Sequence, residues 1–441
     1  MDVVTPGSLT TRALVDYRPS QLRYRWGSNA GAYRHNFARD LQGIAVWQAA
    51  RHATDELIEE ISASLNILQV YEIVWSAEHV ASNFNRIYGH DPSDPSSRHE
   101  KVGSGPFLYI IAADEDADYV VWKNISGKVE LTNRKIALLK PRLRSRVETA
   151  DFRYNVHSSN SLAEFMRDAV LILGLERFRE QLQAGFPGRE TQVRLEQDMA
   201  GASGWCDLAE LFGVMRYACN AVVLRGYEEF ADLSAASDVD EIDLLCDDLP
   251  TFSGTTCSTA TSHDPSKSAF MTMVGGRRVK LDARSVGDGY YDARWQQRML
   301  DSAEWDPVGI PVLEPANYVF SLLYHAKIQK PAVKPLYRRV LPERGYDIGL
   351  PPALASDITT DEVAARLLRG FLIANGYRIS LPIDQGVHHN TSFSKRLKDL
   401  RDRGQPNGRA ARPRRTLRRR AAAIPWLRST YRAIRRALLR K

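Results

Sequence analysis

Short apolar runs of strand length, separated by segments with helical spacing, constrain this chain more than any other feature. LQVYEIVWS, GPFLYIIAADED, VVLRG and EIDLLC are typical of strands. Between them, DELIEEISASLNIL, AEHVASNFNRIYG and NSLAEFMRDAVLILG carry apolar residues three and four apart, which predicts amphipathic helices. We therefore predict an α/β (α+β) fold. Because 441 residues exceed what one simple core accommodates, we expect two or three domains.

The patterns divide the chain into four parts. Residues 1–54 are predicted to be irregular, since LRYRWGSNAGAYRHNF is rich in Gly and Arg. Residues 55–180 form an α/β domain of unknown role, followed by a linker, FPGRETQVRLEQDMAGASG. Residues 205–395 form a small mixed sheet with flanking helices, interrupted by a Ser/Thr-rich loop, TFSGTTCSTATSHDPSKS. Residues 401–441 are a basic tail.

Several classes of protein do not fit this composition. No run approaches the ~18 uninterrupted apolar residues of a membrane span. MDVVTPGSLTTRALVDYRPS lacks the charged-then-apolar pattern of a secretory signal, so we expect a cytoplasmic protein. Its four cysteines show no CxxC spacing and fit reduced thiols better than disulfides or a zinc site.

Two acidic residues on one predicted strand are candidates for a catalytic or metal-binding site. Glu241 and Asp243 alternate in EIDLLC, so both point to the same face. Asp282 lies in the centre of a later strand phrase, VKLDAR. If the strands are neighbours, three carboxylates converge, a ligand set for Mg²⁺ or Mn²⁺ bound together with substrate phosphates. Gly226 ends VVLRG where backbone can approach a phosphate closely.

This order of strands resembles the signature of the polymerase-beta-like nucleotidyltransferases. RRVKLDARSVGDGYYDARW and SLLYHAKIQKP are similar to a fukutin-like branch of that superfamily, which is associated with bacterial surface-polysaccharide genes. The resemblance covers residues 205–395. It implies a nucleoside triphosphate or nucleotide-linked donor, with contacts from Arg225, Gly226 and Lys330. It also implies that the metals and the catalysis belong to Glu241, Asp243 and Asp282, the last also able to help deprotonate an acceptor hydroxyl.

The chain departs from the family pattern in two places, and blander interpretations stay open. Tyr227 follows the glycine where the family has Gly or Ser, and Glu241 stands where it usually has Asp. Asp238 and Asp240 offer a competing register. The two strand acids could be a solvated face, and Asp282 could pair with Arg284 or Arg278.

Other polar residues of this domain are weaker candidates. Asp288 and Asp292 in GDGYYDARW could contact substrate or form a turn and a helix cap. Lys327 or Lys330 could contact a triphosphate, although a solvated lysine is the simpler reading. The adjacent His388 and His389 point in different directions in most conformations, which disfavours a two-histidine metal site. In the first domain, ligand or catalytic roles are open for His99, Glu100 and His157, but histidines near turns are more often structural.

The net charge of +7 hides an uneven distribution. Residues 401–441 carry 15 of the 60 Lys and Arg but one of the 53 acids, so the tail holds +14 and the body −7. Leu427, Tyr431, Ile434 and Leu438 are spaced four, three and four apart, with arginines on either side. We predict an amphipathic helix that binds an anionic membrane surface. Nucleic-acid binding and docking on the acidic body are the alternatives, and the oligomeric state stays open.

The combined expectation is a metal-dependent nucleotidyl- or phosphoryl-group transferase. It would act in cell-envelope polysaccharide biosynthesis on a glycan or lipid-linked acceptor, in the cytoplasm and peripheral to the membrane. The alternative is a catalytically inactive nucleotidyltransferase fold that serves as a scaffold in a glycan-synthesis complex. A nucleotidyltransferase acting on RNA or protein is disfavoured by chain length and by the tail.

Overall fold

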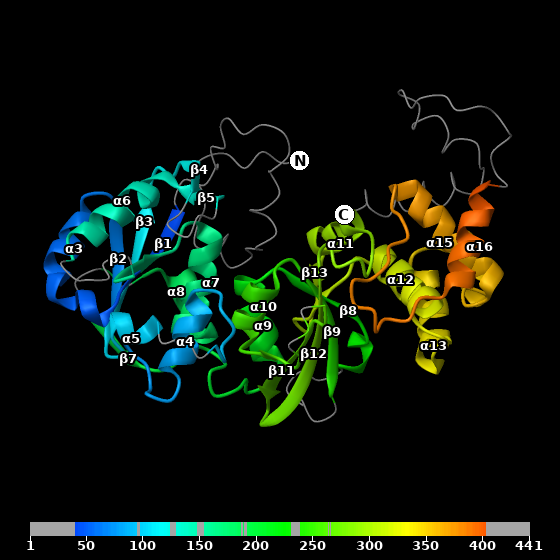
Figure 1. The fold of residues 1–441 in the computed structure, drawn as a ribbon, viewed down its shortest axis with the longest axis horizontal. Helices are drawn as coiled ribbons and strands as arrows, with labels where there is room; N and C mark the ends of the chain where they lie inside the picture. Colours follow the sequence, from blue (N-terminus) through cyan, green and yellow to red (C-terminus); the bar gives the residue numbers. More distant parts are fainter. Residues whose placement is uncertain are drawn as a thin grey trace.

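The computed structural model describes residues 40–402 apart from short gaps. The gaps are residues 95–97, 124–128, 148–153, 187, 189–191, 231–238, 263 and 265. This part of the chain has the predicted mixed α/β architecture, with two main sheets and a group of helices after them (Figure 1). Residues 1–39 and 403–441 lie outside the described residues, and with them nearly all of the predicted basic tail.

The first sheet has five strands in the order β6-β1-β3-β2-β7. β1 pairs antiparallel with β3 and β6, β2 pairs antiparallel with β3, and β7 joins β2 in parallel. A separate hairpin of two strands, β4 and β5, follows β3. The strands are β1 (Asp40–Val46), β2 (Asn66–Val74), β3 (Phe107–Asp114), β4 (Tyr119–Lys123), β5 (Val129–Asn133), β6 (Val156–Ser158) and β7 (Gln192–Glu196).

Helices cover both faces of this sheet because alternate strand residues are apolar on both sides. One face packs its aliphatic residues, among them Ile44 and Ile110, against Leu57 of α3 and Leu139 of α6. The other face packs against α4 and α7. The helices are η1 (Gln48–Ala53), α3 (Thr54–Ser62), α4 (Val80–Ile87), α5 (Arg98–Val102), α6 (Arg134–Ser145), α7 (Leu162–Leu173) and α8 (Leu175–Ala184).

Two sequence predictions about this region are wrong. β1 lies within residues 1–54, which we expected to be irregular, and all seven of its residues are buried. β7 lies within the predicted linker. Both strands are stabilised by pairing with partners far away in the chain, which local patterns do not reveal.

The second sheet has seven strands in the order β10-β11-β12-β9-β8-β14-β13. β9 pairs in parallel with β12 and antiparallel with β8, so the sheet is mixed, as predicted. Its elements are α9 (Leu208–Ala218), β8 (Ala221–Arg225), η2 (Tyr227–Glu229), β9 (Glu241–Cys246), α10 (Leu249–Thr256), β10 (Thr259–Ala260), β11 (Ala269–Val274), β12 (Arg277–Ser285), α11 (Ala293–Asp301), β13 (Glu304–Trp305) and β14 (Pro311–Val312).

The Ser/Thr-rich segment between β9 and β11 is not the continuous loop that we predicted. Its first part is the helix α10, whose N-terminus is capped by the side chain of Asp248, which accepts from Thr251 N. Pro250 lies in the first turn, where its missing N–H costs nothing. Ser253, Thr255 and Thr256 are buried in this helix, so its polar composition conceals a packed element.

Helices form the remainder of the described chain (Figure 1). They pack on one another and on β8 through a second apolar core that includes Tyr291, Trp295 and Leu323. Gly376 ends the longest of these helices in the left-handed conformation that is typical of a residue just after a helix. They are α12 (Pro315–Tyr324), the π-helix η4 (His325–Gln329), α13 (Pro335–Asp347), α14 (Pro352–Ser356), α15 (Asp361–Asn375) and α16 (Thr391–Asp402).

The two sheets share one apolar core rather than standing as separate bodies. A single buried cluster runs from Phe165 of α7 to Phe212 of α9 and on to Leu244 of β9. Arg86 of α4 is buried at the junction, where its guanidinium donates to the carbonyls of Gly254 and Ala200. The sheets are therefore joined by packing and by hydrogen bonds.

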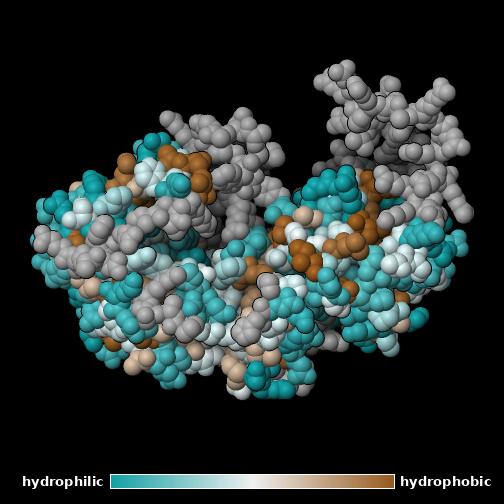
Figure 2. Space-filling view, in the orientation of Figure 1, coloured by the Kyte–Doolittle hydropathy of each residue, from teal (hydrophilic) through white to brown (hydrophobic). Residues whose placement is uncertain are grey.

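The face shown in Figure 2 is largely hydrophilic, with apolar groups gathered over the β4–β5 hairpin and beside the C-terminal helices. The exposed apolar residues of the hairpin include Val121, Trp122 and Val129. Among the described residues, every helix is too short or too polar to traverse a bilayer.

Candidate active site

Three carboxylates meet where β9 and β12 run side by side. The parallel register places Asp282 opposite Asp243, with Lys280 opposite Glu241. One carboxylate oxygen from each of Glu241, Asp243 and Asp282 lies within 4.8 Å of the others. The predicted convergence on one sheet face is thus present.

Burial changes gradually across the trio. The side chains of Glu241, Asp243 and Asp282 are 46%, 26% and 17% exposed. The competing acid, Asp240, lies outside the trio with a side chain that is 91% exposed. Asp238 lies outside the described residues.

Each carboxylate of the trio has a cation beside it. Arg225 Nη2 lies 2.6 Å from Asp243 Oδ1, and Arg284 Nη2 lies 3.0 Å from Asp282 Oδ1. Lys280 Nζ lies 2.8 Å from Glu241 Oε1. The sequence-based alternative for Asp282, a pair with Arg284, is therefore also present. The trio carries no uncompensated charge in this arrangement.

Both arginines contact one buried tyrosine, Tyr290. Arg284 stacks over the ring of Tyr290 at 4.6 Å, and Arg225 donates from Nη2 to the Tyr290 hydroxyl at 3.1 Å. Arg225 is a buried side chain, yet its Nε and Nη1 have no hydrogen-bond partner among the described residues, and neither has Arg284 Nε. Unpaired buried donors are costly, about 1–3 kcal/mol each, which makes an anionic partner for them favourable.

Burial raises the pKa of the Asp282 carboxyl above its ordinary value, and the neighbouring Asp243 adds to this effect, while Arg284 and Arg225 oppose it. Like charges close together hold a proton more tightly, and a cation placed between them reverses the effect. The electrostatics thus favour an added cation or proton at this carboxylate.

The predicted nucleotide contacts lie at the edge of this trio. Gly226 follows Arg225 with φ +78°, a conformation that few other residues adopt, and no atom lies within 4 Å of where its Cβ would be. The backbone there is open to a bulky group. The pKa of Lys330 is lowered, by burial first and then by Lys334 and Arg225, whereas Asp243 and Glu241 act in the opposite direction. Lys330 therefore lies within electrostatic range of the trio.

The π-helix η4 contacts Tyr290, the residue that both arginines contact. His325 Nδ1 lies 2.9 Å from the Tyr290 hydroxyl and 3.0 Å from Gln329 Oε1. Burial, and then Arg225, hold the pKa of His325 well below its ordinary value, so the ring is neutral. Lys327 forms an ion pair with Asp361 and does not join the trio.

The structure separates the remaining candidates of this domain. Asp292 caps α11, accepting from Arg294 N, as the alternative interpretation predicted. Asp288 accepts from Tyr290 N and from Gln296, which supports the loop behind the site. Neither His388 nor His389 belongs to a potential metal-binding group within the described residues.

Two residues of the site were missed by sequence reasoning. Tyr290 lies in GDGYYDARW, which drew notice for its aspartates, and Asp384 lies in PIDQGVHHN, which drew notice for its histidines. Asp384 Oδ2 lies 3.4 Å from Arg284 Nη1. Both side chains contact the arginines beside the trio, and neither was the residue for which its motif was noticed.

His99 and Glu100 of the first domain lie on α5, and among the described residues they join no metal-binding group. His157 does join one, described below. Scans of protein-family models, of curated proteins and of solved structures found no match to this chain.

Proposed function

We propose that this protein is a Mg²⁺- or Mn²⁺-dependent nucleotidyl- or phosphoryl-group transferase. The observation that carries the proposal is the parallel register of β9 and β12, which brings Glu241, Asp243 and Asp282 to within 4.8 Å of one another. Oxygens that share one Mg²⁺ at ~2.1 Å lie about 3 Å apart when adjacent and about 4 Å apart when opposite. Small side-chain rotations, together with release of the paired cations, would therefore close the trio around an ion.

The residues around the trio fit the binding of a phosphorylated donor. Arg225 and Arg284 hold buried N–H groups with no partner among the described residues, and phosphate oxygens accept such bonds strongly. Gly226 leaves room for phosphate beside the backbone, and Lys330 adds positive charge. A bound metal would neutralise the developing charge on the donor and orient it. Asp282, with its raised pKa, is suited to accept the proton of an acceptor hydroxyl.

The acceptor belongs to the same proposal. Leu381 and Ile383 are exposed on the segment that carries Asp384, so apolar surface adjoins the Arg284 side of the site. A glycan precursor on a lipid carrier would use such surface. Binding of the tail to anionic membrane would place a cytoplasmic enzyme beside that acceptor.

Binding and transfer assays test this function. Isothermal titration of the full chain with each nucleoside triphosphate, with and without Mg²⁺, should reveal metal-dependent binding. Asp243→Asn and Asp282→Asn should weaken it at least tenfold, as loss of metal ligation requires. The matched control is Asp240→Asn, because that neighbouring acid points into solvent. Binding that is equal in all four proteins contradicts the proposed metal role.

One observation favours a second candidate, a catalytically inactive scaffold. Arg225, Arg284 and Lys280 already neutralise the three carboxylates, as fixed structural ion pairs would. Under this alternative the chain binds neither Mg²⁺ nor nucleotide, and Asp243→Asn acts only on stability. The same titrations therefore separate the two candidates.

A further inference from the structure

A second group of chemically active side chains lies under α7, on the first sheet. Register places His157 of β6 opposite Ala45 of β1, and Ala45 opposite Tyr109 of β3. Residues opposite one another point to the same face, so His157 and Tyr109 flank a small residue. Gly43, two positions from Ala45, leaves the space in which the Tyr109 hydroxyl lies. Small residues on β1 thus open a polar site beneath the helix.

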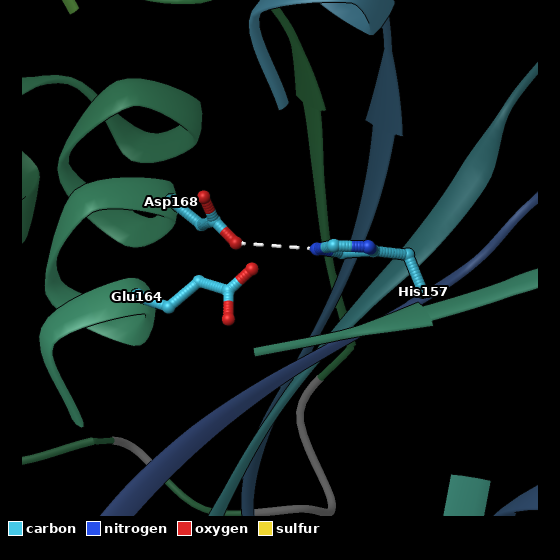
Figure 3. A group of neighbouring side chains, drawn as sticks. All are labelled: His157, Glu164 and Asp168. Atoms are coloured by element: carbon cyan, nitrogen blue, oxygen red, sulfur yellow. Dashed lines mark hydrogen bonds and ion pairs between the residues drawn. The ribbon is translucent and has the colours of Figure 1, made fainter. Parts of the chain in front are cut away.

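The helix above supplies two carboxylates to this site. Glu164 and Asp168 are four residues apart on α7 and therefore share one helix face. Figure 3 shows both carboxylates directed at the imidazole of His157, from the opposite side of the same space. One ligand atom of each residue lies within 4.8 Å of the others.

The spacing of these atoms fits metal ligation better than a hydrogen bond. His157 Nε2 and Asp168 Oδ2 are 3.4 Å apart, longer than the 2.7–3.2 Å of an ordinary N–H···O bond. Two ligands of a tetrahedral Zn²⁺, each at ~2.1 Å from the ion, lie about 3.4 Å apart. The observed separation therefore equals one edge of such a coordination sphere.

Neighbouring groups hold the two carboxylates in place. Arg167 donates to Asp168 Oδ1 from Nε and Nη2, which leaves Oδ2 facing the histidine. Asn160 N donates to Glu164 Oε2, and Glu164 Oε1 lies 3.6 Å from Arg167 Nη2. Metal ligands are commonly oriented by such outer hydrogen bonds.

An independent observation also indicates a missing ligand. The hydroxyl of Tyr109 is buried and has no hydrogen-bond partner among the described residues. It lies within electrostatic range of Asp168 and Glu164. A water bound to a metal beside these carboxylates could provide the partner that a buried hydroxyl otherwise requires.

We propose that His157, Glu164 and Asp168 bind a divalent transition-metal ion, with Zn²⁺ the best fit. The imidazole nitrogen favours Zn²⁺ over Mg²⁺, and Asp or Glu oxygens accompany histidine in catalytic Zn²⁺ sites. The fourth position is open to water, since Glu164 is partly exposed. The ion ties β6 to α7, and this site is independent of the proposed transferase function.

Zinc binding by the full chain, stripped with a chelator, tests the proposal. Competition titration should find one Zn²⁺ site whose affinity falls at least tenfold in His157→Phe, which keeps a ring and removes the nitrogens. Glu164→Gln should give the same loss, and its partly exposed position makes misfolding less of a concern. Circular dichroism checks that each variant is folded.

Asp240→Asn is the matched control, since this exposed acid belongs to neither carboxylate group and its loss should leave the zinc affinity unchanged. In addition, Zn²⁺ should raise the Tm of the wild-type chain and of Asp240→Asn but not of Glu164→Gln. The proposal is overturned if the wild-type chain binds no Zn²⁺. It is equally overturned if folded His157→Phe and Glu164→Gln bind it as the wild-type chain does.

Discussion

Removal of the Arg225 charge probes the ion pair on which the candidate active site depends. The Arg225 side chain is 6% exposed and its guanidinium lies 2.6 Å from Asp243. Unit charges about 4 Å apart interact by about 4 kcal/mol at an effective dielectric constant of 20. Because the Asp243 side chain is 26% exposed, water screens the two charges and reduces this interaction energy. We therefore expect a coupling of about 2 kcal/mol, between the values for buried and exposed pairs.

A double-mutant cycle measures this coupling. Arg225→Met, Asp243→Asn and the double variant are unfolded in urea, and the coupling is the part of their free energies of unfolding that is not additive. The control cycle is Lys280→Met with Glu241→Gln, a pair on the same sheet face in which both side chains are over 40% exposed. Its coupling should be below about 1 kcal/mol. A coupling for Arg225–Asp243 no larger than that of the control refutes the reasoning.

The same variant separates two roles of Arg225 in ligand binding. If the arginine competes with a metal ion for Asp243, Arg225→Met binds Mg²⁺ alone more tightly than the wild-type chain does. If its unpaired Nε and Nη1 contact phosphate, the variant binds nucleoside triphosphate more weakly. Opposite changes for the two ligands are the expected outcome, measured by titration calorimetry.

Three further predictions concern other parts of the chain. Burial raises the pKa of Asp40 from 3.8 to about 6, so the folded state keeps a proton that the unfolded chain loses between these values. Stability should therefore fall as the pH rises from 4 to 6, by on the order of 2–3 kcal/mol, and urea unfolding of Asp40→Asn should show a flatter pH profile. Gly226→Ala should lower the free energy of unfolding by about 1 kcal/mol in the same assay, because a φ of +78° is strained for alanine, whereas no neighbouring atom would clash with its Cβ. Removal of residues 410–441 should abolish sedimentation with anionic vesicles but not alter the weak binding to neutral ones, and equal binding of the full chain to both contradicts the electrostatic anchor.

The trio of acids could be predicted because strand alternation is a local property. Glu241 and Asp243 are two residues apart, so a strand places them on one face whatever its neighbours are. Asp282 is different, because its place beside Asp243 depends on a parallel pairing across about forty residues of chain. The sequence placed Asp282 in a strand, but its convergence with the other two acids could be stated only on the condition that the strands are neighbours. The pairing of Asp282 with Arg284 could be proposed from sequence, whereas the Arg225–Asp243 pair was harder to foresee, since Arg225 reaches Asp243 through an irregularity between β8 and β9.

The errors in the fold share a physical cause. DLQGIAV contains a polar start and a glycine, so it scores as a weak strand, yet all of β1 is buried between β3 and β6. β7 has only one buried residue, Leu195, and its strand conformation depends on pairing with β2. Long-range pairing overrides local propensity in both cases. The helix α7 was predictable because its apolar spacing is encoded within a few residues, and the structure gives Ser161 as its N-cap.

The two carboxylate groups show how the same sequence signal can lead to different ligands. In one, three acids stand on sheet strands with three cations around them, so an arriving Mg²⁺ must displace arginine or lysine, and a phosphate can stabilise the displaced guanidinium. Metal and nucleotide binding should therefore be coupled there. In the other, Arg167 binds one oxygen of Asp168 and leaves the second facing His157, so an ion can enter without breaking the Arg167–Asp168 pair. It follows that Zn²⁺ should bind the chain in the absence of nucleotide, whereas Mg²⁺ should bind tightly only in its presence.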